Sequence, residues 1–477
     1  MWQSLPDEVL LGVFSFMSDR ASLNAGLTCR GWFKVSRDNL LWKKRLYAKY
    51  APTQLLDASL EPFRDDSQSS FLSVYKSFEQ EVPRVCIQTL TFHNDEVLHV
   101  SFSNNGRFVC SSSKDARAAI WTVTDQLQLE RYDVINFSDY RVVGVPWLHV
   151  QYSEFNADDT MLLVSACGML GDSNRGEVAV YDMQLKQVIG LYKNNPFDLA
   201  GTWLDDTTVV HGQLRFVGER MTDTVVSASD VVSNVQPDSK EIGCFRCING
   251  AYLRQLRILT FKTAEYLESG DDHCRALLYT LGESYYSPHQ LGCCVIPASA
   301  SYSDSVKKAS GKGFLAVEFN GHVIGLAVST DQQYLYVNCR SFTDDHVEPG
   351  PSVGPPIVSD VAMRVYRLKS PMEWEHIQTL SGHRCFTEAE NCFFIYLDVG
   401  KHYVASGAED KQVHIWHRQS GARVACLAGH DDVVNSVALN PSNPGMLVSG
   451  SDDYTVKVWL SRMLTRLDSS HPTLNRL

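Results

Sequence analysis

Three segments of the chain repeat a set of four residue types whose side chains could carry chemistry. Each set has a histidine, then a serine, then an aspartate four residues after the serine and a tryptophan six residues after the aspartate. Histidine, serine and aspartate are the residue types of a hydrolase triad, in which the serine attacks a carbonyl carbon. The sets are His93, Ser111, Asp115 and Trp121; His383, Ser406, Asp410 and Trp416; and His430, Ser449, Asp453 and Trp459.

The set recurs in three segments, which favours a structural role over a catalytic one. In addition, no G-x-S-x-G nucleophile elbow accompanies the serines. In each set we expect the aspartate in a turn, the serine on the strand before it and the tryptophan on the strand after it. These positions allow a buried Trp–Ser–His–Asp hydrogen-bond chain. Such a chain has to be complete, since a buried polar group without a partner costs roughly 1–3 kcal/mol. The sets are therefore predicted to be structural tetrads, and no catalytic residue is expected.

A second group of residues could bind a metal ion through cysteine thiolates. Its C-x-x-C pair lacks a second pair at a defined spacing, and cysteines also serve as small core residues in strands. We therefore expect no metal and no other cofactor. The pair is Cys244 and Cys247, and the residues that could complete a zinc site are His273, Cys274, Cys293 and Cys294.

Composition limits the classes of partner. The 477 residues carry 43 lysines and arginines against 55 aspartates and glutamates, and this formal net charge of −12 repels the phosphates of nucleic acid. No run approaches the roughly 18 apolar residues that a membrane span needs, and no secretory signal is recognisable. The 13 scattered cysteines, an odd number, fit reduced thiols. We expect a cytoplasmic protein, with the nucleus as a further location, that binds neither nucleic acid nor membrane.

The tetrads need elements that hold them, and from residue 85 the sequence consists of short β-rich runs separated by turn residues. Weaker copies of the repeat accompany the three strong ones, and two more are expected in the degenerate stretch 195–315. About seven such units would close into a ring. The strong copies are 91–121, 381–416 and 428–459, and the weaker ones are 153–182 and 320–339 together with 361–368.

The N-terminal residues predict short helices. Asp7 and Glu8 favour the positive end of a helix dipole, and an apolar stripe at helical spacing follows them. A second helix with Asp19 as its cap and a third helix over 29–50 come next. A unit of this size is marginal alone, so it is either a cap packed on the rest of the protein or a docking module for a partner. The stripe is Leu10, Val13, Phe14 and Met17.

Residues 3–46 resemble an F-box, with a leucine–proline opening, an apolar helix, a cysteine followed by a tryptophan, and a terminal Leu41-Trp42. The resemblance implies binding to the Skp adaptor of cullin–RING ubiquitin ligases, with Leu10 and Phe14 partly exposed in the free protein. Asn24-Ala25-Gly26 departs from the pattern, because glycine lowers helix propensity by about 1 kcal/mol. The implied adaptor-binding residues are Leu5, Pro6, Leu10, Phe14, Leu23, Leu27, Cys29 and Trp32.

The β-rich segments resemble WD repeats, each of which forms one blade of a β-propeller. The resemblance predicts a mainly β fold, an about seven-bladed propeller preceded by the small helical domain. The predicted organisation is an F-box over 1–46, a linker with a helix at 69–80 over 47–84, the propeller over 85–465 and a tail over 466–477.

WD-repeat receptors of the damaged-DNA-binding adaptor often carry W-D-x-R at a blade end, with the arginine reaching the adaptor. Trp459 and Arg462 fit that spacing, but Leu460 replaces the aspartate, and Arg418 comes one residue early. Arg418 and Arg462 are therefore candidates for a second adaptor contact. The alternative is that both are exposed basic residues after strands.

An F-box before WD repeats resembles the F-box/WD-repeat family, which implies a non-catalytic substrate-recognition subunit of an SCF-type cullin–RING ubiquitin ligase. The damaged-DNA-binding adaptor and its cullin are the second system. The protein would recruit protein substrates for ubiquitination and proteasomal degradation, including regulators of centriole duplication or the actin cytoskeleton. The alternatives are a non-degradative WD-repeat scaffold and an enzyme that uses the central channel. The Pro/Gly/Asp-rich loop 340–360 is either a substrate contact or a tolerated insertion.

Overall fold

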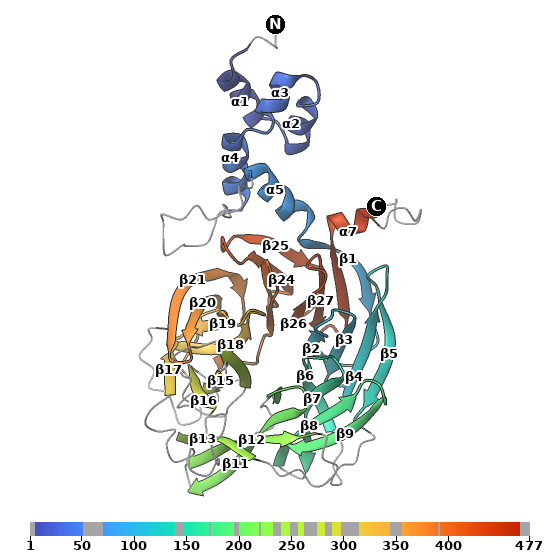
Figure 1. Ribbon diagram of the computed structural model, residues 1–477, viewed down its shortest axis with the longest axis vertical. Helices are drawn as coiled ribbons and strands as arrows, with labels where there is room; N and C mark the ends of the chain where they lie inside the picture. Colours follow the sequence, from blue (N-terminus) through green and yellow to red (C-terminus); the bar gives the residue numbers. More distant parts are fainter. Residues whose placement is uncertain are drawn as a thin grey trace.

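The computed structural model shows a small helical domain attached to one side of a ring of β-sheets (Figure 1). No helix in the described parts of the protein is long and apolar enough to cross a membrane. The described residues are 5–50, 70–138, 147–170, 173–194, 200–218, 221–231, 240–248, 256–261, 274–281, 289–296, 314–343, 355–389 and 392–467.

The helical domain contains α1 (Asp7–Ser15), α2 (Asp19–Ala25), α3 (Arg30–Val35) and α4 (Asn39–Lys49), and α5 (Phe71–Gln80) leads to the ring. The hydroxyl of Ser18, and not the carboxylate of Asp19, accepts a hydrogen bond from the first turn of α2. The single helix expected over 29–50 is wrong. The helix breaks after α3, and the Asp38 carboxylate caps α4 by accepting the N–H of Leu40 at 2.8 Å.

Gly26 ends α2 at a close approach to Ser36. A Cβ atom at Gly26 would lie 2.1 Å from Oγ of Ser36 and 2.8 Å from its Cβ. The Ser36 hydroxyl is buried and donates a hydrogen bond to the carbonyl of Phe33 at 2.9 Å, so it does not move aside freely. The glycine that departs from the F-box pattern therefore lies at a helix C-cap and allows α2 to approach the end of α3.

Seven four-stranded antiparallel sheets form the ring, which confirms the predicted propeller. After β1 (Pro83–Leu90), six blades follow in sequence order as β2–β5, β6–β9, β10–β13, β14–β17, β18–β21 and β22–β25. The bounds of the strands are β2 Val97–Phe102, β3 Phe108–Ser113, β4 Arg117–Val123, β5 Leu129–Asn136, β6 Trp147–Phe155, β7 Met161–Leu170, β8 Ser173–Asp182, β9 Gln187–Lys193, β10 Thr202–Trp203, β11 Thr208–Gly218, β12 Met221–Asp230, β13 Lys240–Ile248, β14 Leu256–Phe261, β15 Cys274–Leu281, β16 Gln290–Ile296, β17 Phe314–Glu318, β18 Gly321–Val328, β19 Tyr334–Ser341, β20 Asp360–Ser370, β21 Glu373–Arg384, β22 Leu397–Val399, β23 Tyr403–Ser406, β24 Gln412–His417, β25 Arg423–Ala428, β26 Val434–Leu439, β27 Met446–Ser451 and β28 Val456–Ser461.

The ring closes through a strand from the opposite end of the propeller sequence. β1 pairs antiparallel with β28, with Leu90 opposite Val456 and Pro83 opposite Ser461, so the last blade consists of β1, β28, β27 and β26. The helix α7 (Arg462–Leu467) follows β28 directly. Closure gives every blade two neighbours, and the apolar faces of the sheets are buried between them.

Helix α5 fixes the helical domain to the ring. The rings of Phe78 and His417 lie 4.9 Å apart between centroids, and Arg84 donates a hydrogen bond to the carbonyl of Phe78 at 3.0 Å. On the other side of α5, Lys49 of α4 pairs with Glu79 at 2.6 Å. One apolar cluster accordingly extends from α1 through α4 and α5 into the sheet of β22–β25. The helical domain is therefore a packed extension of the ring (Figure 1).

Candidate functional site

The apolar residues of the predicted adaptor site divide into buried and half-buried ones. Leu10 and Phe14 are only 3% and 1% exposed and belong to the core that α1 shares with α4 and α5. The expectation that these two side chains are partly exposed is wrong, because a stripe at helical spacing marks the face that the helix buries. Leu5, Leu23 and Trp32 are half-buried against the same cluster.

The other predicted adaptor residues lie at helix ends. Pro6 is the exposed N-cap residue of α1, and Cys29 is the half-buried N-cap residue of α3. Leu27 follows the C-cap of α2 and is 74% exposed. Of the eight residues expected to bind the adaptor, Leu27 is thus the large apolar side chain that is available to a partner without rearrangement.

Val13, which the sequence pattern grouped with Leu10 and Phe14, does not lie on the buried face but belongs to a second apolar stripe of α1 that faces solvent. Val9, Val13 and Phe16 follow one another at i, i+4 and i+7 and are 49%, 41% and 93% exposed. We call these three residues the outer stripe. Apolar side chains gathered at the surface of a small domain indicate an interaction site. The signal in the sequence was that α1 is apolar on two faces, so that one stripe can fill the core and the other remains at the surface.

Two of the three predicted tetrads form the expected hydrogen-bond chain. In each, the tryptophan N–H donates to the serine hydroxyl, which contacts Nε2 of the histidine, and Nδ1 of the histidine contacts the aspartate. The successive distances are 2.9, 2.9 and 3.0 Å for Trp121, Ser111, His93 and Asp115, and 2.8, 2.7 and 2.8 Å for Trp459, Ser449, His430 and Asp453.

The carboxylate of the last tetrad is held in its ionised form. Burial opposes the ionisation of Asp453, but hydrogen bonds with His430 and Thr455 outweigh it and keep the pKa of Asp453 well below its usual value. The main-chain N–H of Asp431 adds a hydrogen bond of 3.0 Å. Asp453 therefore joins the turn between β27 and β28 to the segment that connects the preceding blade to β26, which is a structural role.

The third predicted tetrad does not form. Asp410 contacts Nε2 of His414 at 2.9 Å, and the indole N–H of Trp416 donates to the carbonyl of Ser381 at 3.2 Å. Ser406 donates instead to the carbonyl of Gly407. His414, four residues after the aspartate, thus takes the place at the carboxylate that His383 was expected to occupy. Both ring nitrogens of His383, which is 1% exposed, consequently have no hydrogen-bond partner among the described residues.

Both arginines considered for a second adaptor have contacts within the protein. Arg418 donates to the hydroxyl of Tyr336 at 3.1 Å and to the carbonyl of Gly400 at 2.9 Å, so it joins neighbouring blades. Arg462, on α7, is half-exposed and donates to Glu79 of α5 at 3.2 Å. A contact of Arg418 or Arg462 with the damaged-DNA-binding adaptor stays a prediction.

Two further regions singled out in the sequence are only partly described. The side chains of Cys244, Cys247 and Cys274 and all of His273 lie outside the described residues, while Cys293 and Cys294 of β16 are buried and form no disulfide. No group of three or more histidine, cysteine or acidic side chains suited to a metal ion occurs in the described part of the protein. Of the loop 340–360, residues 344–354 lie outside the described residues, and its ends meet in a bridge between Phe342 and Ile357.

Comparison with known proteins assigns the same two parts. A model of the F-box-like family matches residues 2–47, and the model "WD domain, G-beta repeat" matches 84–122, 374–417 and 421–459. F-box/WD repeat-containing protein 5 of Rattus norvegicus is 29% identical, over 98% of this chain and 96% of the relative. The Homo sapiens protein of the same name is 28% identical over 97% and 95%. The WD repeat-containing protein WDS homolog of Arabidopsis thaliana is 25% identical over 81% of this chain and 60% of the relative. The protein therefore combines a helical F-box-like domain with a seven-bladed propeller that contains WD repeats, and it is similar over nearly its whole length to F-box/WD repeat-containing proteins.

Proposed function

We propose that the protein is the substrate-recognition subunit of an SCF-type cullin–RING ubiquitin ligase. The F-box-like domain binds the Skp adaptor, and the propeller binds protein substrates that are then ubiquitinated and degraded by the proteasome. The subunit itself is non-catalytic, since the transfer chemistry belongs to the partner enzymes. It works in the cytoplasm and also in the nucleus.

The outer stripe of α1 is the observation that carries the proposal. Phe16 is 93% exposed, and Val9 and Val13 lie beside it on consecutive turns of the helix. Leu27, Phe33 and Leu40 of the same domain are 74%, 48% and 64% exposed. A domain of this size loses stability by leaving so many apolar side chains in water. Burial against an adaptor would recover that free energy, and central apolar anchors typically contribute about 2–4 kcal/mol to binding.

The packing of the helical domain against the propeller through α5 also supports a positioning subunit. Lys49 and Glu79 join α4 to α5, and Phe78 and His417 join α5 to the propeller. A ligase gains rate when its substrate is held at a fixed place relative to the transfer enzyme. A loosely tethered helical domain would lack that advantage.

Co-purification tests the proposal. The full-length protein, expressed with an affinity tag in cells treated with a proteasome inhibitor, should capture the Skp adaptor and a cullin in amounts comparable to the bait. Substrate proteins should accumulate on it under the same treatment. Capture of substrates without adaptor or cullin would instead identify the non-degradative scaffold.

A further inference from the structure

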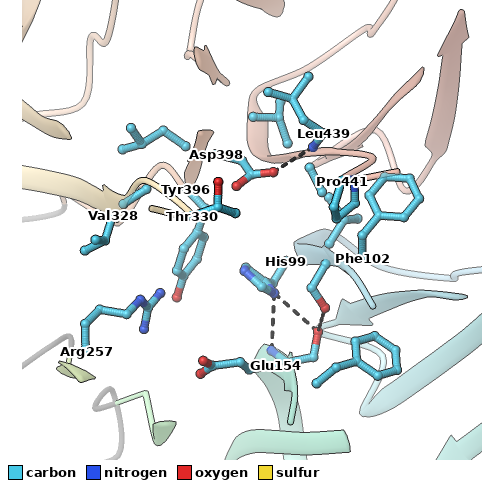
Figure 2. A pocket seen from close by; sticks show the side chains of 18 of the residues that line it. His99, Phe102, Glu154, Arg257, Val328, Thr330, Tyr396, Asp398, Leu439 and Pro441 are labelled. Atoms are coloured by element: carbon cyan, nitrogen blue, oxygen red, sulfur yellow. Dashed lines mark hydrogen bonds between the residues drawn. The ribbon is translucent and has the colours of Figure 1, made fainter. Parts of the chain in front are cut away.

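The inner strands of the propeller surround a cavity of about 410 Å³ in the central channel (Figure 2). Its walls come from β2, β6, β14, β18, β22 and β26, which are the first strands of their blades. The cavity includes Asn104, Thr330 and Pro441, which lie in the turns that follow β2, β18 and β26. It therefore reaches the end of the channel at which the inner strands finish.

That end of the channel is on the side of the helical domain. Leu439, in the cavity wall, lies opposite Leu447, and Leu447 lies opposite Trp459, close to the end of β28. Pro83 pairs with Ser461, the last residue of β28, and Pro83 follows α5. A ligand in the cavity would thus approach the ring from the face on which α5 is attached.

Arg257 places a cation in the wall of this cavity. The guanidinium of Arg257 lies 4.9 Å from the ring centroid of Tyr152, and one of its N–H groups donates to the carbonyl of Leu256 at 2.8 Å. Arg257 forms no ion pair with any described residue, although it remains protonated in proteins. Figure 2 shows the side chain of Tyr396 extending toward Arg257 from the opposite wall. Guanidinium N–H groups remain available to an incoming acceptor.

Two carboxyl groups share the cavity with Arg257, and both are fixed by other donors. Glu154 accepts a hydrogen bond from the hydroxyl of Tyr152 at 3.1 Å, and burial raises its pKa despite the nearby arginine. Asp398 accepts the main-chain N–H groups of Leu439 and Val399 at 2.7 and 2.8 Å, and burial raises its pKa as well. Neither carboxyl group therefore forms a hydrogen bond or ion pair with the guanidinium of Arg257.

His99 supplies a neutral donor to the same space. Its Nδ1 accepts the main-chain N–H of Ser153 at 3.2 Å, which assigns the ring proton to Nε2. Burial and the charge of Arg257 hold the pKa of His99 well below its usual value, so the ring stays uncharged. The rings of Tyr152 and Tyr396 pack on His99 with centroids 4.4 and 4.5 Å away and fix its orientation.

We propose that the channel cavity binds a carboxylate of a protein partner, from the partner's C-terminus or from an acidic side chain, against Arg257. The Nε2–H group of His99 lies in the same wall as a second donor, and Glu154 can accept an N–H of the bound peptide. A carboxylate fits better than a phosphate because one guanidinium faces two carboxyl groups here. A phosphate dianion would add more negative charge than the single guanidinium can neutralise.

This inference names a substrate chemistry for the proposed receptor, but the cavity can be tested without the ligase. Immobilised full-length protein would be incubated with four pools of acetylated heptapeptides whose random positions exclude Asp and Glu. One pool ends in a free carboxylate, one in an amide, one is amidated with a single glutamate, and one is amidated with a single phosphoserine. The retained fraction is measured by mass spectrometry, and capture of the Skp adaptor is measured on the same protein.

The wild type should retain the free-carboxylate pool or the glutamate pool over the neutral amidated pool, and whichever is retained identifies the source of the carboxylate. Arg257→Met should lower that retention about tenfold or more, as truncation of one partner of a buried charged hydrogen bond does. Arg107→Met, in an exposed turn of the first blade outside the cavity, should leave retention unchanged. Glu154→Gln should increase retention by removing a competing negative charge, a gain that a misfolded variant cannot produce.

Equal retention of all four pools by the wild type would overturn the inference, as would a preference for phosphoserine over both carboxylate pools. The inference would also be overturned if Arg257→Met retained the carboxylate pool as well as the wild type does and Glu154→Gln retained no more of it than the wild type. If the wild-type protein retains the carboxylate pool but does not capture the Skp adaptor, the result would count against the proposed ligase function and not against the carboxylate site.

Discussion

The carboxylate of Asp410 lies 2.9 Å from Nε2 of His414, four residues further along the sequence. In the two complete tetrads the corresponding aspartate contacts the histidine of the preceding turn instead. The consequence is a buried imidazole, that of His383, whose two nitrogens make no hydrogen bond within the described part of the protein. The same sequence pattern thus has opposite energetic effects in two neighbouring blades.

Replacement of the tetrad histidines should separate these effects. His430→Leu should lower the free energy of unfolding by roughly 1–3 kcal/mol, because it leaves Asp453 and Ser449 without their partner. His383→Leu should change that free energy little or raise it, because it removes an unsatisfied buried polar group. Denaturant unfolding monitored by tryptophan fluorescence provides the comparison. A larger loss for His383→Leu than for His430→Leu would contradict the geometry described for the third repeat.

The pair of His414 and Asp410 should make stability depend on pH. Burial opposes the charge of His414, but Asp410 and Cys426 outweigh it and raise the pKa of His414 above its usual 6.5. Because folding raises this pKa, the protonated form of His414 stabilises the fold. That stabilisation is fully present at pH values below 6.5 and is lost as the pH rises through the folded-state pKa. Asp410→Asn should therefore cost more stability at pH 5.5 than at pH 8.5.

Asp125→Asn is the control for this measurement, because it removes the same charge from an exposed turn. Its effect on unfolding should be small at both pH values. A cost of Asp410→Asn that grew as the pH rose from 5.5 to 8.5 would reverse the expected sign and reject the assignment.

Two faces of α1 should respond differently to substitution. Val13→Asp with Phe16→Asp, in the outer stripe, should abolish capture of the Skp adaptor and leave the melting temperature unchanged. Leu10→Ala with Phe14→Ala, in the core, should destabilise the helical domain, since each such truncation typically costs about 2–5 kcal/mol. Leu185→Asp, at a 61% exposed position of a propeller turn, is the matched control. Normal adaptor capture by the outer-stripe variant would show that the adaptor binds elsewhere.

Gly26 offers a test of the close contact between α2 and α3. Gly26→Ala should gain about 1 kcal/mol of helix propensity, but the new Cβ would lie 2.1 Å from Oγ of Ser36. Overpacking of this kind typically costs about 1–3 kcal/mol, so the variant should be net destabilised. In a Ser36→Gly background the same substitution should become neutral or stabilising. Purely additive effects in this double-mutant cycle, measured by thermal unfolding, would exclude the steric explanation.

The number of blades could be predicted because the information for each blade is local. Turn residues, alternating strands and the spacing of Ser449, Asp453 and Trp459 all lie within one repeat of the sequence. The pairing of β1 with β28 could not be read in the same way, because it joins residues such as Leu90 and Val456 at opposite ends of the propeller. Local patterns specify the blades, and the closure of the ring depends on their combined geometry.

The candidate sites were harder to predict for the same reason. The apolar stripe of Leu10 and Phe14 was visible in the sequence, but it marks the buried face of α1, and exposure depends on how α4 and α5 pack against it. Arg257 lies in a degenerate stretch without a motif. Its meeting with Glu154 and Asp398 follows only from the arrangement of inner strands from distant blades around one channel.

The closing strand also determines the order in which the parts of the protein can mature during synthesis. β1 leaves the ribosome about 370 residues before the end of β28, the strand with which it pairs. At typical translation rates of about 5–20 residues per second, β1 waits roughly 20–75 s for that partner. The helical domain precedes β1 and packs many of its large apolar residues within its own helices. A nascent polypeptide would therefore present the proposed adaptor surface of the helical domain before the ring has closed.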